Sequence, residues 1–160
     1  MSTIHLFLVL FFVLVLDQAT KYLAQVFLSS SVSFPIIRGI FHLTLVHNSG
    51  AAFGLLKGGT FLFIIISIIC VIAIVLLLKN NALFSKIFAL DAQDKLVRFS
   101  LGLILGGAFG NLIDRLRFSY VVDFLDFRIW PVFNVADSAI TIGGIVLFFR
   151  ILINQKTVKN

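Results

Sequence analysis

Residues 60–78 read TFLFIIISIICVIAIVLLL, and this run of 19 residues carries no charge. A helix that crosses a bilayer needs about 20 predominantly apolar residues, because each residue adds only about 1.5 Å along the helix axis. The stretch therefore predicts a membrane-spanning helix, and the rest of the chain is interpreted outward from it.

The composition of the whole chain agrees with a membrane protein. Of its 160 residues 60% are hydrophobic and only 12% are charged, and the mean hydropathy is +1.11. Both values depart strongly from those of a soluble domain. The net charge of +6 does not indicate a nucleic-acid partner, because the basic residues are scattered among the apolar segments. The single cysteine, Cys70, excludes a disulfide within one chain.

Three further apolar windows, residues 4–27, 96–115 and 135–153, are long enough to span a membrane, but polar residues interrupt them. Asp17 and Lys21 lie within the first window, and Asp114 ends the uncharged part of the second. The third has only 12 residues between Asp137 and Arg150. Full spans therefore draw these polar groups to the membrane boundary.

Four spans place both termini on one side and nearly all of the interrupting polar groups on the other. Seven basic residues lie on the side of the termini: Lys79, Lys86, Lys95, Arg98, Arg150, Lys156 and Lys159. Five lie on the opposite side: Arg38, Lys57, Arg115, Arg117 and Arg128. The excess favours cytoplasmic termini and an outward-facing polar cluster.

The outer loops contain two strand-like segments. Apolar and polar residues alternate in FHLTLV (41–46), and YVVDFLDF (120–127) is rich in β-branched and aromatic residues. The predicted fold is an all-α polytopic membrane protein of four transmembrane helices, with a small β-sheet and a short helix in the outward-facing loops. We expect a single integral-membrane domain over residues 1–160.

Asp17 and Lys21 are spaced i, i+4 on the first span and therefore share one helical face. A paired charge is tolerated in a membrane far better than a lone one. The pattern predicts an ion pair, and it leaves open whether the pair is structural or takes part in chemistry.

The stretch GGAFGNLIDR (106–115) combines a packing motif with polar groups. Gly102, Gly106 and Gly110 repeat at four-residue spacing, which permits close approach of a neighbouring helix. Packing does not account for Asn111 and Asp114, which end a second stripe. Arg115 is suited to pair with an acid or to reach a lipid phosphate.

The last span begins in FNVAD (133–137), where Asn134 and Asp137 share a face with Thr141 and Gly144. Either Asn134 or Asp137 suits the N-cap of that helix. The alternative is that Asp137 takes part in chemistry.

The seven acidic residues are all aspartates, so motifs that need a glutamate base, such as H-E-x-x-H, are excluded. Five have a basic residue close in sequence: Asp17 (Lys21), Asp91 and Asp94 (Lys95, Arg98), Asp114 (Arg115) and Asp126 (Arg128). Asp123 and Asp137 have no cation within three positions. Two such carboxyls brought together cannot readily both ionise, so one stays protonated while the other activates water. This is the arrangement of an aspartic protease.

Other chemistries fit less well. HNSG (47–50) has no later histidine to serve as the base of a serine protease. An ion or proton pathway, or a lipid-binding scaffold, does not explain why the polar groups gather at one end of the spans.

Five segments in order carry a family resemblance: DQATK (17–21), NSGAAF (48–53), GGAFGNLIDR (106–115), VVDF (121–124) and FNVADSAITIG (133–143). Together they closely resemble bacterial lipoprotein signal peptidase, or signal peptidase II, over nearly the whole chain. The resemblance implies a membrane aspartic endopeptidase that removes signal peptides from diacylglyceryl-modified prolipoproteins, cutting just before the lipidated cysteine.

The resemblance also implies roles for particular residues. Asp123 and Asp137 match the catalytic dyad, with no metal or other cofactor. The supporting and substrate-contacting positions match Asp17, Lys21, Asn48, Gly50, Asn111, Asp114, Arg115 and Asn134. We expect a monomer in the bacterial cytoplasmic membrane whose partners are lipid-modified prolipoproteins and membrane lipids, without nucleic acid.

Overall fold

The structure is a computed structural model, and it describes residues 3–50 and 58–158. In chain order its elements are α1 (Thr3–Phe27), β1 (Phe34–Ile37), β2 (Phe41–Asn48), α2 (Thr60–Lys79), α3 (Asn81–Phe88), α4 (Lys95–Phe118), β3 (Val121–Asp126) and α5 (Val135–Val158). The helices α1, α2, α4 and α5 are each long and apolar enough to cross a membrane. The prediction of four spans is therefore confirmed.

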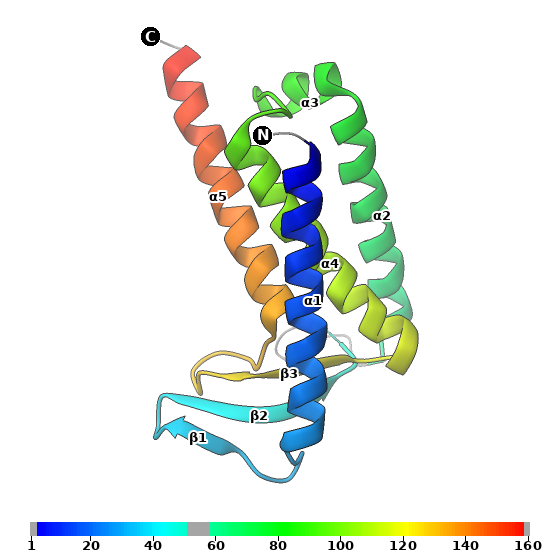
Figure 1. The fold of residues 1–160 in the computed structure, drawn as a ribbon, viewed down its shortest axis with the longest axis vertical. Helices are drawn as coiled ribbons and strands as arrows, with labels where there is room; N and C mark the ends of the chain where they lie inside the picture. The colour runs from blue at the N-terminus through cyan, green and yellow to red at the C-terminus, as the bar shows by residue number, and fades with distance from the viewer. Residues whose placement is uncertain (1–2, 51–57, 159–160) are drawn as a thin grey trace.

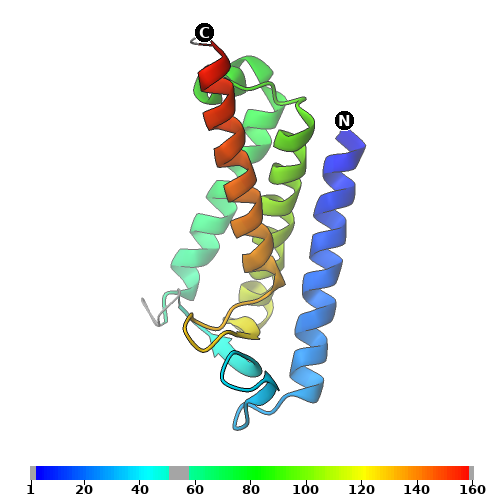
Figure 2. The ribbon, with the colours of Figure 1, turned by 90° about the vertical axis from the view of Figure 1, so that its left-hand side faces the viewer.

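Helix α4 forms the centre of the bundle, with α1, α2 and α5 packed around it (Figures 1 and 2). Its glycines explain how α1 comes so close. A Cβ atom at Gly106 would lie 2.8 Å from the carbonyl oxygen of Leu10, and one at Gly110 would strike the Asp17 carboxylate. The small-residue stripe predicted from the sequence is thus the face of α4 that receives α1.

The two ends of the bundle differ. Both termini and α3 lie at one end, and the sheet lies at the other (Figure 1). The short helix expected in the loops beside the sheet is not found among the described residues of those loops. The short helix that the structure contains, α3, lies at the opposite end, where Asn80 caps it by accepting a hydrogen bond from the backbone N–H of Leu83.

The sheet has three antiparallel strands in the order β1, β2, β3. The two predicted strands correspond to β2 and β3, so that prediction is confirmed, whereas β1 was not predicted. Along β3 the side chains alternate between two faces. Val122 and Phe124 pack against Ala24 of α1 and Leu45 of β2. Asp123 therefore points to the other face.

Candidate active site

The strand β3 presents Asp123 from within the sheet. Asp123 pairs with Val46 in the β2–β3 register, and Asn48 pairs with Val121, two residues away on the same face. Asn48 consequently reaches Asp123, and its Nδ2 donates to Asp123 Oδ2 at 2.9 Å. Asp123 is only 2% exposed. The sheet thus holds a buried carboxyl group that accepts a hydrogen bond from a side-chain amide.

The first turn of α5 presents Asp137. Asn134 precedes the helix, and its Oδ1 accepts from the backbone N–H of Asp137 at 2.8 Å. In return Asp137 Oδ2 accepts from the backbone N–H of Asn134 at 3.3 Å. This reciprocal pair is a capping box with aspartate in place of glutamate. Asn134 is therefore the N-cap, and Asp137 completes the cap through its Oδ2.

Asparagine amides link the two aspartates. Asn111 Nδ2 donates to Asp137 Oδ1 at 2.7 Å, and Asn134 Nδ2 donates to Asp123 Oδ1 at 2.7 Å. Asn134 Nδ2 also donates to Asn111 Oδ1 at 3.1 Å. Each of the four carboxylate oxygens therefore accepts at least one hydrogen bond, and both carboxyl groups are held in defined orientations.

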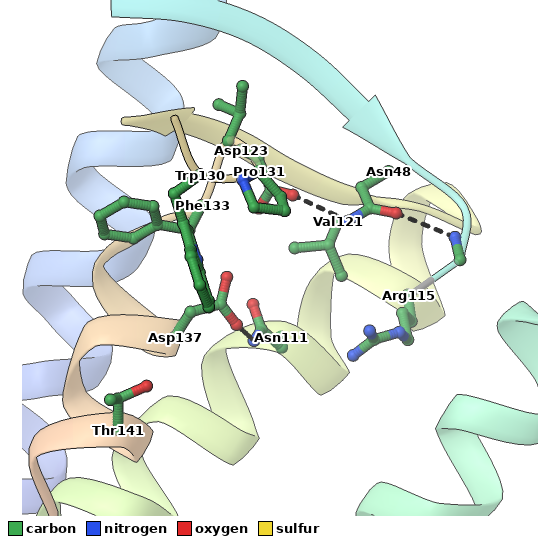
Figure 3. Close-up of a pocket in the computed structure, with 12 residues that line it drawn as sticks. Asn48, Asn111, Arg115, Val121, Asp123, Trp130, Pro131, Phe133, Asp137 and Thr141 are labelled. Atoms are coloured by element: carbon green, nitrogen blue, oxygen red, sulfur yellow. Dashed lines mark hydrogen bonds between the residues drawn. The ribbon is translucent and has the colours of Figure 1, made fainter. Parts of the chain in front are cut away.

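Both aspartates line a single cavity of about 270 Å³ at the sheet end of the bundle (Figure 3). Its walls are formed by Asn48, Gly50, Asn111, Arg115, Val121, Asp123, Trp130, Pro131, Val132, Phe133, Asp137 and Thr141. In Figure 3 Asp123 comes from β3 and Asp137 from α5, with Asn111 of α4 beside Asp137. Three separate parts of the chain thus bring their polar groups to one space.

The pKa of Asp123 is raised to about 7, first by burial and second by the nearby charge of Asp137. The hydrogen bonds from Asn48 and Asn134, and the charge of Lys21, act against this rise. Near neutral pH Asp123 therefore exchanges between its protonated and ionised forms. A carboxyl group with such a pKa is suited to give and take a proton.

Beneath the cavity lies an ion cluster made of Asp17, Lys21 and Asp114. Lys21 Nζ is 2.9 Å from Asp17 Oδ2, 3.0 Å from Asp114 Oδ2, and it donates to Asn111 Oδ1 at 3.0 Å. These three contacts use all three N–H groups of the ammonium. The predicted pair of Asp17 and Lys21 is present, and a second acid shares the lysine.

Known proteins resemble this chain over most of its length. The model of the family described as Signal peptidase (SPase) II matches residues 9–153. A lipoprotein signal peptidase of Halothermothrix orenii is 47% identical over 150 residues, which cover 94% of this chain and 97% of that protein. One of Moorella thermoacetica is 49% identical over 141 residues, 88% of each chain. The chain belongs to the signal peptidase II family.

Solved structures agree with this membership. A bacterial membrane enzyme of 33% sequence identity matches with a TM-score of 0.85 and covers 97% of this chain and 92% of its own. A second bacterial membrane enzyme, 34% identical, matches with a TM-score of 0.80. The protein is therefore a membrane protease of the signal peptidase II family, and the family resemblance seen in the sequence is confirmed.

The residues singled out from the sequence fall into two groups. Six line the cavity: Asn48, Gly50, Asn111, Arg115, Asp123 and Asp137. The other four, Asp17, Lys21, Asp114 and Asn134, are buried and hydrogen-bond to one another or to the cavity residues. The structure thus brings all ten to the sheet end of the bundle.

One pairing suggested by sequence neighbours is different in the structure. Asp114 forms its ion pair with Lys21 of α1, not with the adjacent Arg115. The guanidinium of Arg115 lies over the ring of Phe63 in α2, 5.2 Å from the centroid. Adjacent residues on a helix point about 100° apart, so Arg115 turns toward α2 while Asp114 turns toward α1. Arg117 lines a separate polar pocket beside Gln18 and Asp114, and neither Asp123 nor Asp137 lines that pocket.

Some contributors to this site were not singled out from the sequence. Gln18 Nε2 donates to Asp114 Oδ1 at 3.0 Å and approaches both Asp17 and the carbonyl oxygen of Gly110. Its place beside Asp17 in the DQATK segment was the available signal. The loop from Trp130 to Phe133 forms one wall of the cavity, and the sequence carried no pattern for it. Within residues 3–50 and 58–158, no group of His, Cys and Asp side chains is arranged to hold a metal ion.

Proposed function

We propose that the protein is an aspartic endopeptidase that cleaves the signal peptide from diacylglyceryl-modified prolipoproteins, just before the lipidated cysteine. The observation that carries the proposal is the shared cavity of Asp123 and Asp137 at one end of four apolar helices. The matched relatives are named as lipoprotein signal peptidases, which supports the same class of substrate.

We assign the two aspartates different starting roles. Asp123 begins as the acid, because its pKa of about 7 leaves it substantially protonated at neutral pH. Asp137 is assigned the complementary role of base, because it lines the same cavity and holds no proton in the starting state of this scheme. When two close carboxyl groups share a proton, one is protonated and acts as the acid while the other is ionised and acts as the base.

The proton transfers balance over one cycle. Asp137 takes a proton from water as the water oxygen bonds to the scissile carbonyl carbon, and Asp123 gives its proton to the carbonyl oxygen. When the C–N bond breaks, the proton held by Asp137 goes to the leaving amine. The hydroxyl proton of the intermediate returns to Asp123 as the new carboxyl group forms. Both aspartates then regain their starting states.

The surroundings of the dyad supply orientation and charge. Asn48, Asn111 and Asn134 direct their amide N–H groups at the two carboxyl groups. Arg115 lines the same cavity, and its cation is placed to attract the phosphate or carbonyl groups of lipid and peptide near the scissile bond. We therefore assign these residues to support and substrate contact, together with Gly50.

We further propose that residues 1–160 act as one domain and as a monomer, since one chain supplies every residue assigned to the site. The excess of basic residues on the side of the termini supports cytoplasmic termini in a bacterial cytoplasmic membrane. The site then faces outward. This fits a substrate whose mature part lies outside the cell membrane and whose lipid lies in the outer leaflet.

The test is cleavage of a lipidated prolipoprotein, followed by gel shift and by mass analysis of the new N-terminus. We expect the wild-type enzyme to release a product that begins at the lipidated cysteine. Asp123→Asn and Asp137→Asn should each abolish cleavage while insertion and yield remain unchanged. Near-normal turnover in either variant would exclude the dyad, and cleavage at another position would exclude the assigned substrate site.

A further inference from the structure

The residue before each of the two aspartates is held by a buried carboxylate. The backbone N–H of Val122, next to Asp123, donates to Asp114 Oδ2 at 3.0 Å. The backbone N–H of Ala136, next to Asp137, donates to Asp17 Oδ1 at 2.9 Å. Asp114 thus fixes the strand that carries one aspartate, and Asp17 fixes the helix end that carries the other.

Lys21 joins these two attachments. Its ammonium contacts Asp17 Oδ2 and Asp114 Oδ2, so a single side chain connects both carboxylates. The chain of contacts runs from Val122 through Asp114, Lys21 and Asp17 to Ala136. It crosses from β3 through α4 and α1 to α5, and α1 is far from the other three elements in the sequence.

The third N–H group of Lys21 acts on the amide of Asn111. Asn111 Oδ1 accepts from Lys21 at 3.0 Å and from Asn134 Nδ2 at 3.1 Å. Two donors on the oxygen fix which end of the amide points toward them. The Nδ2 group of Asn111 is thereby directed at Asp137 Oδ1, where it donates at 2.7 Å.

The cluster is a costly means of packing helices together. Lys21 and Asp17 are 2% and 0% exposed, and removing such charges from water is strongly unfavourable before they attract one another. Apolar side chains of similar size would pack the same helices without that cost. Hydrogen bonds to a common ammonium do provide fixed directions and distances, which apolar contacts do not.

We propose that Lys21 is a positioning residue that sets the relative placement of Asp123 and Asp137 through Asp114, Asp17 and Asn111. The inference rests on the proposed function, in which these two aspartates carry out the chemistry. Lys21 does not line the cavity, so it acts on the rate of the chemical step and not on substrate contact.

The test measures kcat and KM of Lys21→Met on a lipidated prolipoprotein, per mole of folded enzyme. A displacement of about 1 Å at a reacting group costs about 100-fold in rate. We therefore expect kcat to fall about 100-fold, while KM stays within about threefold because the cavity walls are retained. A variant with wild-type kcat, or one whose loss lies wholly in KM, overturns the proposal.

The matched control is Arg150→Met, which also removes a cation that ties α5 to an acid at an end of α4. This ion pair lies at the end of the bundle away from the sheet. We expect kcat and KM of this variant to equal those of the wild type. A similar loss of kcat in Arg150→Met would show that any loosening of the helices is sufficient, and would overturn the specific role of Lys21.

A second variant covers the case in which Lys21→Met does not fold. The triple change Asp17→Asn, Lys21→Met, Asp114→Asn removes all three charges, so none is left buried without a partner. We expect it to fold and still to lose kcat about 100-fold, because the lysine link is absent. A folded triple variant with near-normal kcat contradicts the proposal.

A double-mutant cycle separates a connected cluster from independent contacts. If Asp114 acts through Lys21, then adding Asp114→Asn to Lys21→Met should lower kcat by much less than Asp114→Asn lowers it alone. Losses that multiply contradict a shared pathway. If Asp123→Asn and Asp137→Asn are inactive but Lys21→Met has a normal kcat, this inference is wrong and the proposed function stands. If Asp123→Asn or Asp137→Asn is active, the proposed function is wrong.

Discussion

The two ends of the helix bundle each contain an ion pair that connects α4 to another helix, but the paired side chains differ in their exposure to solvent. At the sheet end Lys21 is 2% exposed and serves two aspartates. At the other end Arg150 and Asp94 form a 2.8 Å pair whose side chains are 26% and 23% exposed. The second pair is thus far more exposed to water and salt than the first. An exposed ion pair stabilises the fold slightly, whereas burying charges carries a desolvation cost. The buried cluster is hydrogen-bonded to the residues next to Asp123 and Asp137, which are assigned to chemistry.

The largest effect on stability is expected from breaking the buried cluster. Lys21→Met leaves Asp17 and Asp114 buried without their shared cation, so the free energy of unfolding should fall by about 3–5 kcal/mol. Removing Asp17 and Lys21 together should not restore it, because Asp114 then remains unpaired. Only neutralising all three should recover stability. Unfolding in detergent of the single, double and triple variants checks this order, and full recovery in the double variant would show that Asp114 does not share the lysine.

The next largest effect is expected on the cleavage rate when the substrate lacks its lipid. A diacylglyceryl group embedded among the apolar helices would keep the scissile bond near Asp123 and Asp137, which makes the reaction effectively intramolecular. The same peptide without its lipid should be cleaved about 100-fold more slowly, equivalent to about 3 kcal/mol of lost binding. The comparison uses lipidated and lipid-free forms of one prolipoprotein in identical micelles. Equal rates would contradict lipid recognition and favour a general membrane peptidase.

A smaller effect is expected from Asn48→Ala, which removes one hydrogen bond from Asp123. That bond favours the ionised carboxylate and holds the pKa of Asp123 down, so its loss should raise the pKa. The alkaline limb of the rate profile should then move to higher pH, and kcat/KM should fall about tenfold with the lost orientation. Steady-state kinetics across the pH range check both changes. A limb that moves to lower pH would contradict the direction of this contact.

The smallest effect is expected at the exposed end. Arg150→Met should lower the free energy of unfolding by about 1 kcal/mol or less, since the pair is partly exposed to water. The hydrogen bond from Arg150 lowers the pKa of Asp94. The pair therefore contributes its full stability above about pH 4 and loses it as the pH falls through the lowered pKa of Asp94. Thermal unfolding of wild type and variant at pH 7 and pH 3 measures the difference, which should shrink at pH 3.

Much of this fold could be predicted because the membrane imposes a strong pattern. Residues 60–78 are apolar throughout, and the two predicted strands show alternation or β-branched enrichment. Strand β1 escaped prediction for a physical reason. It contains Pro35, all four of its residues are exposed, and it lies at the edge of the sheet. Such a strand carries no buried face and hence no alternating signal.

The candidate site was predictable in its residue types but not in its contacts. The spacing of Asp17 and Lys21 fixes their proximity, because both lie on one helix. The contact between Lys21 and Asp114 depends on how closely α1 and α4 pack. The same holds for Gln18, which approaches the carbonyl oxygen of Gly110 although the two residues are 92 positions apart in the sequence. Backbone donors such as the N–H groups of Val122 and Ala136 carry no mark in the sequence. These contacts follow only from the assembled fold.

The central claim is that Asp123 supplies a proton while Asp137 is ionised, and the pH dependence of kcat/KM tests it most directly. For the wild-type enzyme on a lipidated prolipoprotein, we expect a bell-shaped profile. Its alkaline limb should fall tenfold per pH unit above about pH 7, as Asp123 loses its proton. Its acid limb should fall when both carboxyl groups are protonated. A rate that stays level or rises from pH 7 to pH 9, with the enzyme still folded, would contradict the account.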